Sequence, residues 1–400
     1  MQVEKLGGRI KTLRKRKKLT LEGLAGKGMT KGMLSLIENN KAKPSMESLI
    51  YIAGKLGVSV NELLENISIT EIRGLLQETE DPFNKKEYEK VVELLSSLPL
   101  DSLPLSYEAA AILERYSRAS YHAGRGEWEE IYKQAEEMYI ALNLHNEAAK
   151  FLSFLVKAYM EKRNYYTAFG MLIERKERWE NENANLNILG KLELDYNEIL
   201  LLFAIGKYND AKKKLESSIS LSYKSGTFYQ IEGLYRLACF YAMMNAEEQD
   251  VEIYLKKLTL FGEFIDSDES RSAVLILKAH YHNKYTRNFT KAEQFIEEYY
   301  YINGLDPYYA MEKGKSLFRA KQYEQALKSF LEFKEIPEWI HPFDLSLMYE
   351  VYAYIARCYD QLDEKQKAVH YSKYALDGIG TLPETPYKEF VKNTALLINR

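Results

Sequence analysis

The segment that decides the fold begins with Leu-Gly-Gly-Arg-Ile-Lys-Thr-Leu-Arg at residues 6–14 and ends with Leu-Gly-Val-Ser-Val-Asn-Glu-Leu-Leu at residues 56–64. Between these two stretches, apolar residues recur three and four positions apart, a spacing that predicts short amphipathic helices. Thr20, Thr30 and Ser45 stand where helix N-caps are expected. We therefore predict a small bundle of five short helices.

Two of these helices, 20–27 and 30–39, are joined by a glycine-containing turn, the arrangement of a helix-turn-helix. The segment resembles the Cro/C1-type (XRE) helix-turn-helix family, and the residues that carry the resemblance are Arg9-Ile10, Leu13-Arg14, Leu19-Thr20, Leu24-Ala25, Ser35-Leu36-Ile37-Glu38, Pro44-Ser45, Leu49, Ile52-Ala53 and Leu56-Gly57-Val58. The resemblance implies that helix 30–39 enters the major groove of DNA. It also implies a buried ion pair between Arg14 and Glu38.

The same resemblance implies which residues contact DNA. The bases would face Thr30, Lys31, Gly32 and Ser35, and the phosphates would face Asn39, Lys41 and Lys43. Three positions depart from the family pattern, namely Leu21, Leu36 and Gly32. We therefore expect little direct base readout, with more weight on Lys31 and on DNA shape.

Charge separates this head from the rest of the chain. Residues 1–66 hold 13 Lys and Arg against 6 Asp and Glu, a net charge of +7, whereas the remaining 42 Lys and Arg and 52 Asp and Glu give −10. A basic head on an acidic body is typical of nucleic-acid binding by the head alone.

The body is predicted to be built of repeated helix pairs. An aromatic residue followed three positions later by a small or branched one occurs at Tyr88/Val91, Trp128/Ile131, Tyr165/Ala168, Tyr208/Ala211, Phe289/Ala292 and Tyr323/Ala326, with weaker copies at Glu248/Val251 and Lys365/Ala368. The steps between copies are 34 to 43 residues long, a period that indicates stacked helix pairs. A connecting helix precedes them and is expected to break at Asp81-Pro82.

The spacing within each copy resembles the tetratricopeptide repeat (TPR). This implies an all-α protein in which the five-helix head, residues 1–66, is followed by a linker helix and first repeat elements, 67–100, and by a right-handed TPR superhelix, 101–400. First helices of the pairs would line its inner wall. Side-chain amides there could clamp an extended peptide backbone, and we predict peptide binding by Lys157, Asn197, Tyr235, Asn245, Asn283, Arg319 and Arg357.

No motif for catalysis, cofactor binding or metal binding occurs, so we expect a protein that is not an enzyme and needs no cofactor. Cys239 and Cys358 lie far apart in apolar helical patterns and are expected to be buried free thiols of a cytoplasmic protein. No signal peptide or membrane-spanning run is expected.

A helix-turn-helix head followed by degenerate TPR repeats resembles the RRNPP family of peptide quorum-sensing regulators, and the first residues and the length resemble its NprR/PlcR branch. The resemblance implies a cytoplasmic transcription regulator, a dimer or larger oligomer, whose operator binding is controlled by a re-imported signalling peptide. It also implies a second role, binding of a sporulation phosphorelay response regulator when no peptide is present.

Two alternatives remain open. The body could recruit a protein partner to DNA and ignore peptides, or the chain could be a TPR scaffold with a vestigial head. The expected partners are therefore operator DNA, a short signalling peptide, a second copy of the chain and a response regulator. We expect no membrane partner.

Overall fold

The structure is a computed structural model that describes residues 6–60, 63, 67–336 and 340–398. All the regular elements in these ranges are helices, which confirms the predicted all-α fold of a helix-turn-helix head followed by TPR-like helix pairs. The chain divides into two compact units, one ending at Phe151 and the other beginning at Leu152. The finer boundaries at residues 66 and 100 stay predictions.

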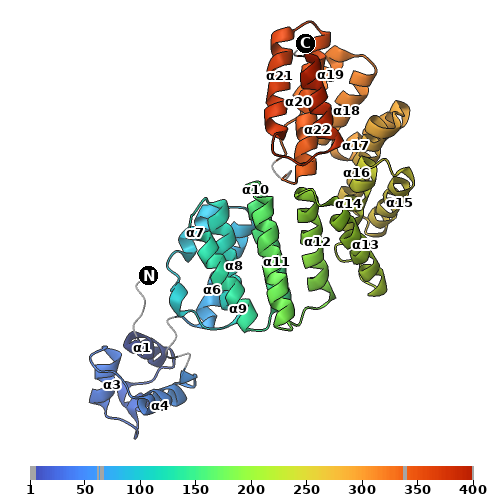
Figure 1. Cartoon of the computed structure of the whole chain (residues 1–400). Helices are drawn as coiled ribbons and strands as arrows, with labels where there is room; N and C mark the ends of the chain where they lie inside the picture. The colour runs from blue at the N-terminus through green and yellow to red at the C-terminus, as the bar shows by residue number, and fades with distance from the viewer. Residues whose placement is uncertain (1–5, 61–62, 64–66, 337–339, 399–400) are drawn as a thin grey trace. The chain divides into compact units, whose positions relative to one another are not determined.

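The helices follow one another along the chain as Figure 1 shows. The first unit contains α1 (Leu6–Arg16), α2 (Leu21–Ala25), α3 (Lys31–Glu38), α4 (Met46–Leu56), α6 (Ile69–Asn84), α7 (Tyr88–Leu95), a 3-10 turn (Leu100–Ser102), α8 (Tyr107–His122) and α9 (Trp128–Ala141). Helix α10 (His145–Glu161) spans the boundary. The second unit continues with α11 (Tyr165–Asn181), α12 (Ile188–Ala204), α13 (Tyr208–Lys224), α14 (Ile231–Met244), α15 (Glu248–Phe264), α16 (Asp268–Tyr281), a π-helical turn (His282–Thr286), α17 (Phe289–Asn303), α18 (Pro307–Arg319), α19 (Tyr323–Leu331), α20 (Pro342–Gln361), α21 (Lys365–Ile379) and α22 (Pro386–Ile398).

The head folds as its apolar spacing predicts. The Thr20, Thr30 and Ser45 side chains each accept a hydrogen bond from a backbone N–H three residues later, so all three N-caps are confirmed. Such caps stabilise a helix by about 1 kcal/mol each. The head encloses its own core, formed by Ile10, Leu24, Ala25, Leu34, Ile37, Leu49, Ile52, Leu56 and Leu63. Most of the predicted fifth helix, including Leu64, lies outside the described residues.

The predicted break at Asp81-Pro82 is wrong, because α6 continues to Asn84 with Pro82 inside it. A proline lacks the N–H for one helical hydrogen bond and is disfavoured in a helix interior. Pro82 stands in the last turn, where little helix remains to be disrupted, and its ring is buried. Its carbonyl accepts a hydrogen bond from the Glu87 N–H, which closes the turn toward α7.

The repeat pattern of the body is confirmed helix by helix. Each of the eight motifs, including the two weaker ones, coincides with the first residue of a second helix, at α7, α9, α11, α13, α15, α17, α19 and α21. The small or branched residue three positions later is fully buried in every copy, as at Ala211 and Ala326. The small side chain lets the two helices of a pair approach closely at this point.

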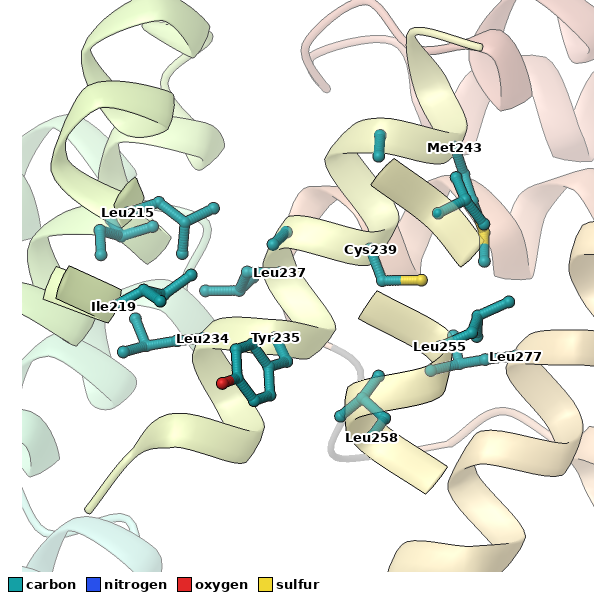
Figure 2. Close-up of a cluster of buried hydrophobic side chains, with 14 of the residues drawn as sticks. Leu215, Ile219, Leu234, Tyr235, Leu237, Cys239, Met243, Leu255, Leu258 and Leu277 are labelled. Carbon is teal, nitrogen blue, oxygen red and sulfur yellow. The ribbon is translucent and has the colours of Figure 1, made fainter. Parts of the chain in front are cut away.

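Helices α12 to α16 share one apolar core in the second unit (Figure 2). Leu215 and Ile219 of α13 lie on one side of α14, and Leu255 and Leu258 of α15 lie on the other. Cys239 of α14 is fully buried in this core, as predicted, and burial raises the pKa of its thiol to about 12.

Late helices of the second unit contact early ones. The His341 ring, just before α20, donates its Nε2–H to the Leu200 carbonyl of α12 at 3.1 Å. The Tyr165 hydroxyl of α11 donates to the Ile340 carbonyl at 3.1 Å. The segment before α22 also takes part, because the Tyr208 hydroxyl donates to the Glu384 carbonyl at 2.8 Å. These contacts join segments of the second unit that are far apart in the sequence.

Candidate DNA-binding helix and inner cavity

A buried ion pair fixes α3 against α1 in the head. Arg14 Nε donates to Glu38 Oε1 at 2.6 Å and a second guanidinium nitrogen donates to Oε2 at 2.9 Å. The hydrogen bonds that Arg14 donates to the Glu38 carboxylate raise the pKa of Arg14. The same guanidinium donates to the Leu19 carbonyl at 2.9 Å, so Arg14 also holds the start of the turn that leads to α2. The predicted structural role of this pair is confirmed.

The predicted base-contacting residues lie on the first half of α3. The Thr30 hydroxyl caps the helix by accepting a hydrogen bond from the Met33 N–H at 3.1 Å, so one of its hydrogen-bonding positions is already used within the head. Lys31 extends into solvent, and a Cβ added at Gly32 would meet no atom closer than 4.0 Å. Ser35 is half-buried. The surface around Lys31 and Gly32 is therefore open enough for the approach of a partner.

The predicted phosphate-contacting residues follow directly after α3. The Asn39 side-chain amide donates to the Ser35 carbonyl at 2.8 Å and so terminates the helix. Lys41 and Lys43 are exposed in the next turn. Four more exposed cations follow one another at the end of α1, from Lys15 to Lys18.

Apolar side chains add to the exposed surface of α3. Met33 and Leu36 are each 46% exposed although they lie on a helix whose other face is core. Leu36 is one of the two apolar departures from the family pattern. The other, Leu21, packs against the core of the head.

A cavity of about 700 Å³ lies among the first helices of the second unit. Its wall comes mainly from α12, α14, α16, α18 and α20, with the end of α17. Apolar side chains cover much of it, among them Leu200, Leu237, Phe240, Phe343 and Leu347. A volume of this size is typical of small-ligand sites.

Two polar side chains stand where α20 begins. His341 accepts from the Phe343 N–H through Nδ1 and donates through Nε2, so its ring is neutral, and burial lowers its pKa to about 4. Asp344 makes no hydrogen bond and no ion pair within the part of the chain that the structure describes. Burial raises the pKa of its carboxyl to about 7. Tyr196 lies nearby, and burial raises the pKa of its phenol to about 12.

Comparison with known proteins assigns the head. A family described as helix-turn-helix matches residues 10–63. The matched residues contain α2 and α3, the two helices of the predicted helix-turn-helix. The immunity repressor protein of Bacillus phage phi105 is 30% identical over 97 residues, which are 24% of this chain. The chain spans 63% of the length of that repressor.

Solved structures with similar architecture include two proteins in complex with a peptide. PlcR of Bacillus thuringiensis, in complex with the peptide PapR7 and DNA, is 19% identical with a TM-score of 0.37, and the match covers 68% of this chain and 99% of PlcR. ComR of Streptococcus vestibularis, in complex with its signalling peptide XIP, is 19% identical with a TM-score of 0.35, and the match covers 70% and 99%. The predicted resemblance to peptide-sensing regulators is thus met again among solved structures, without singling out the NprR branch.

Two of the predicted peptide-binding amides are occupied inside the protein. Asn197 is buried, and its amide donates to Ser153 Oγ and to the Glu193 carbonyl, both at 2.8 Å. Asn283 is buried as well and donates to the Glu312 carboxylate at 2.9 Å. Neither amide is free in this state of the protein, so a peptide could engage them only by displacing these bonds.

The predicted arginines lie close together near the ends of α18 and α20. Arg357 donates through Nε to Thr394 Oγ1 at 2.7 Å, and its guanidinium lies 4.2 Å from the centre of the Phe390 ring of α22. Arg319 is half-buried and its Nε has no partner within the described residues. The carboxyl-terminal helix α22 therefore covers part of the wall on which these residues were expected to be open.

The other three predicted residues lie apart from one another. Lys157 is exposed on α10. Tyr235 is buried, with its hydroxyl bonded to that of Tyr223 and with Lys257 5.1 Å from its ring centre. Asn245 lines a smaller hollow beside Tyr241 and Pro386. None of the seven residues lines the large cavity, and their role in peptide binding stays a prediction.

In two helices, the residue predicted to face inward lies one position away from the residue that lines the cavity. Tyr196 and Arg236 line the cavity, and they directly precede Asn197 and follow Tyr235. A shift of one residue turns a side chain by about 100° around a helix. The repeats are too degenerate to fix which residue of such a neighbouring pair faces inward.

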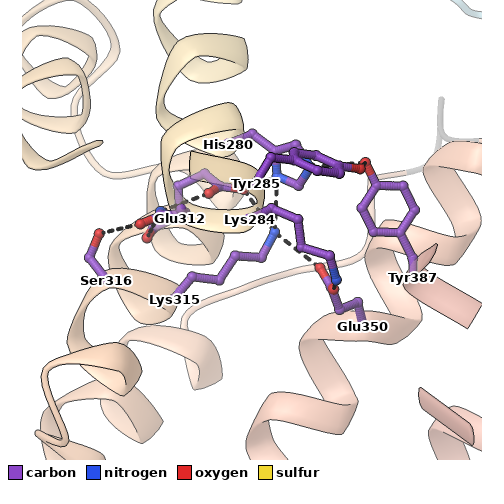
Figure 3. A network of polar contacts seen from close by, with 9 residues as sticks. His280, Lys284, Tyr285, Glu312, Lys315, Ser316, Glu350 and Tyr387 are labelled. Carbon is purple, nitrogen blue, oxygen red and sulfur yellow. Dashed lines mark hydrogen bonds and ion pairs between the residues drawn. The ribbon is translucent and has the colours of Figure 1, made fainter. Parts of the chain in front are cut away.

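Two residues of the cavity wall, His280 and Glu312, also belong to a largely buried cluster of charged groups, here called the buried network (Figure 3). Lys315 Nζ lies 2.8 Å from Glu312 Oε1 and 3.3 Å from Glu350 Oε2, and Lys284 pairs with Glu350. His280 Nδ1 lies 2.9 Å from Glu312 Oε1, and its Nε2 lies 3.0 Å from the Tyr387 hydroxyl. Burial and the Lys315 ammonium lower the pKa of His280, so its ring is neutral. The two lysines and two glutamates cancel in charge.

No group of three or more metal-ligating side chains occurs in the described ranges. Helices long and apolar enough to cross a membrane are also absent from those ranges. The second cysteine, Cys358, is buried and free, and burial raises the pKa of its thiol to about 12.

Proposed function

We propose that this protein is a transcription regulator whose DNA-binding head is controlled by a short peptide held in the inner cavity. The cavity carries this proposal. It is formed by first helices from five different pairs, so a ligand in it contacts all five at once. A ligand shifts a conformational equilibrium only by its different affinity for the two states. A site shared by several repeats offers such a difference, because small rotations between repeats change its shape.

The first test is binding of short synthetic peptides, measured with light scattering and operator affinity in parallel. We expect one class of peptide to bind and to change either the oligomeric state or the affinity for DNA. A variant with the cavity filled, Ala273→Trp, should lose peptide binding, whereas Ile253→Trp on the exposed face of α15 should keep it. Unchanged peptide binding by Ala273→Trp would place the ligand elsewhere.

For the head, we propose that Lys31 and Ser35 contact DNA. The doubly substituted Lys31→Ala/Ser35→Ala protein should lose operator affinity, by about 1–3 kcal/mol if a base contact is removed. Retained affinity would favour the alternative that the head is vestigial. The other predicted DNA-facing residues, Thr30, Gly32, Asn39, Lys41 and Lys43, share this proposal.

The resemblance to the NprR/PlcR branch supports further proposals. The protein acts in the cytoplasm as a dimer or larger oligomer on a two-half-site operator. Without peptide, its body binds a sporulation phosphorelay response regulator. A pull-down with the phosphorelay carrier, with and without peptide, tests this role, and absence of binding in both states would refute it.

A second candidate function is docking of a protein partner on the body. It is favoured by an apolar stripe on the outside of α15, where Ile253, Leu260 and Phe264 are 49%, 55% and 75% exposed and Phe228 contacts Phe264. These three residues lie seven and four positions apart, on one side of the helix. A body that captures a folded protein through this stripe and binds no peptide would establish this alternative.

A further inference from the structure

The cavity wall carries an excess of negative charge. Its carboxylates are Asp268, Glu269, Asp306, Glu312 and Asp344, and its one permanent cation within the described residues is Arg236. The two histidines of the wall, His280 and His341, have pKa values lowered by burial and are neutral. The charge of the wall therefore depends on which carboxylates have cationic partners.

Two of these carboxylates and the arginine are neutralised within the protein. Asp268 pairs with Arg271 at 2.6 Å, and Glu312 pairs with Lys315 at 2.8 Å. Arg236 is held by Glu232 one turn earlier in α14. The cation of the wall is thus committed to a neighbour and does not offset the remaining carboxylates.

Three carboxylates have no cationic partner within the described ranges. Asp306 accepts hydrogen bonds from the Tyr299 hydroxyl at 2.6 Å and from the Tyr309 N–H at 2.8 Å, both neutral donors. Glu269 is exposed at the edge and makes no ion pair, and Asp344 is half-buried without any polar partner. An unpaired carboxylate shielded from water is unfavourable unless a cation or a proton joins it.

Asp344 stands beside the apolar part of the wall. It belongs to the first turn of α20, between Phe343 and Leu347, and Leu237 of α14 lines the same cavity and shares an apolar core with Phe343. A ligand that fills this space would therefore meet apolar surface and one free carboxylate together.

We infer, on the basis of the proposed function, that the peptide taken by this cavity carries a positive charge that pairs with Asp344 and an apolar side chain that packs against Leu237 and Phe343. The positive group is an ammonium or a guanidinium. It comes from a lysine or arginine side chain or from the amino terminus of the peptide, and both sources offer hydrogen-bond donors to the carboxylate.

Four pools of synthetic heptapeptides of otherwise random apolar sequence distinguish these sources. The pools combine a single lysine or norleucine with a free or an acetylated amino terminus, and affinity for the full-length protein is measured by competition against a labelled pool. We expect the neutral pool, norleucine with an acetylated terminus, to bind at least about tenfold more weakly than the best charged pool. The pool that binds best identifies the source of the charge.

The Asp344→Asn variant tests whether Asp344 causes the preference for positively charged peptides. It should bind the neutral pool as the unmodified protein does and lose most of the preference for charged pools, and a thermal unfolding curve verifies that it is folded. Asp268→Asn, whose carboxylate is already paired, should keep the full preference. Equal binding of neutral and charged pools by the unmodified protein would overturn the inference and leave the proposed function intact. Failure of all four pools to bind would overturn the proposed function, and the inference with it.

Discussion

The buried network and the cavity wall both draw on helices α16, α18 and α20 and share His280 and Glu312, yet their charges are arranged in opposite ways. In the buried network, every carboxylate has a lysine within ion-pair distance, and both carboxylates are fully shielded from water. In the cavity wall, Asp344 has no such partner among the described residues. Buried charges are stable only when they are paired. The protein itself completes the charge pairs of the network, and the unpaired carboxylate agrees with the proposal that a ligand completes those of the cavity.

The largest change in stability is expected when one positive charge is removed from the buried network. Lys315→Met leaves Glu312 and Glu350 with Lys284 as their one remaining lysine, a net buried negative charge. Loss of one member of a buried pair typically costs about 3–5 kcal/mol. We expect a decrease of that size in the free energy of unfolding, measured in urea.

Two further variants make this result specific. Lys315→Met combined with Glu312→Gln restores the charge balance and should be more stable than Lys315→Met alone. Lys313→Met on the same helix breaks pairs with Glu293 and Glu297, whose side chains are 42% and 54% exposed, and should cost less than about 1 kcal/mol. Equal losses for Lys315→Met and Lys313→Met would mean that burial does not distinguish the network.

A smaller effect is expected from Tyr387→Phe, which removes a neutral member of the network. The Tyr387 hydroxyl lies 3.0 Å from His280 Nε2 and 3.0 Å from the Tyr285 hydroxyl, and the side chain is fully buried. Leaving a buried polar group unsatisfied costs about 1–3 kcal/mol, so urea unfolding should show a loss in that range. Tyr371→Phe on α21 is the matched control and should be nearly neutral. An unchanged stability of Tyr387→Phe would mean that α22 is not held through this hydroxyl.

Local patterns in the sequence predicted much of the fold. The eight second helices begin where an aromatic or polar residue precedes a small one by three positions, because close helix packing demands a small side chain at that point. The N-caps at Thr20, Thr30 and Ser45 were predictable for the same reason, since a cap is a contact between residues three positions apart. The Arg14–Glu38 pair followed from the family resemblance.

Contacts between distant residues were not predictable in this way. Tyr387 meets His280 across 107 positions, and no local pattern relates the two. Asn283 was predicted to bind a peptide because a side-chain amide can bond to a peptide backbone. The sequence around it does not reveal that its amide already makes hydrogen bonds with Glu312 and Ser316. The unpaired state of Asp344 likewise depends on which side chains arrive from α12 and α14.

For the unpaired carboxylate of the cavity, the same comparison predicts that removal of the charge stabilises the protein. Asp344→Asn should increase the free energy of unfolding at neutral and alkaline pH, because it removes a charge that has no partner. The Tyr196 phenol of α12 is the titratable group that interacts with it electrostatically, and Arg236 of α14 lines the same cavity. The gain should lie between about 1 and 4 kcal/mol, because the rise of the pKa from its ordinary value to about 7 sets the upper figure and solvent that reaches the half-buried side chain lowers it.

The pH dependence of this gain follows from the pKa of Asp344, which burial raises from its ordinary value to about 7. Below the ordinary value the carboxyl is protonated in both folded and unfolded protein, and the variant should equal the unmodified protein. As pH rises toward 7 the unfolded state ionises first, so the unmodified protein loses stability relative to the variant. Above about pH 7 the difference should be constant. A gain that is independent of pH would show that the charge of Asp344 is not its cause.

The smallest effect is expected at Asp268, which belongs to the same wall but pairs with Arg271, and whose side chain is 73% exposed. Asp268→Asn should change the free energy of unfolding by less than about 0.5 kcal/mol, since exposed pairs contribute little. Its preference among the charged and neutral peptide pools should also stay intact. If Asp268→Asn reduced that preference as much as Asp344→Asn does, the summed potential of the whole rim would select the cation, and the distinction between paired and unpaired carboxylates would no longer explain ligand binding.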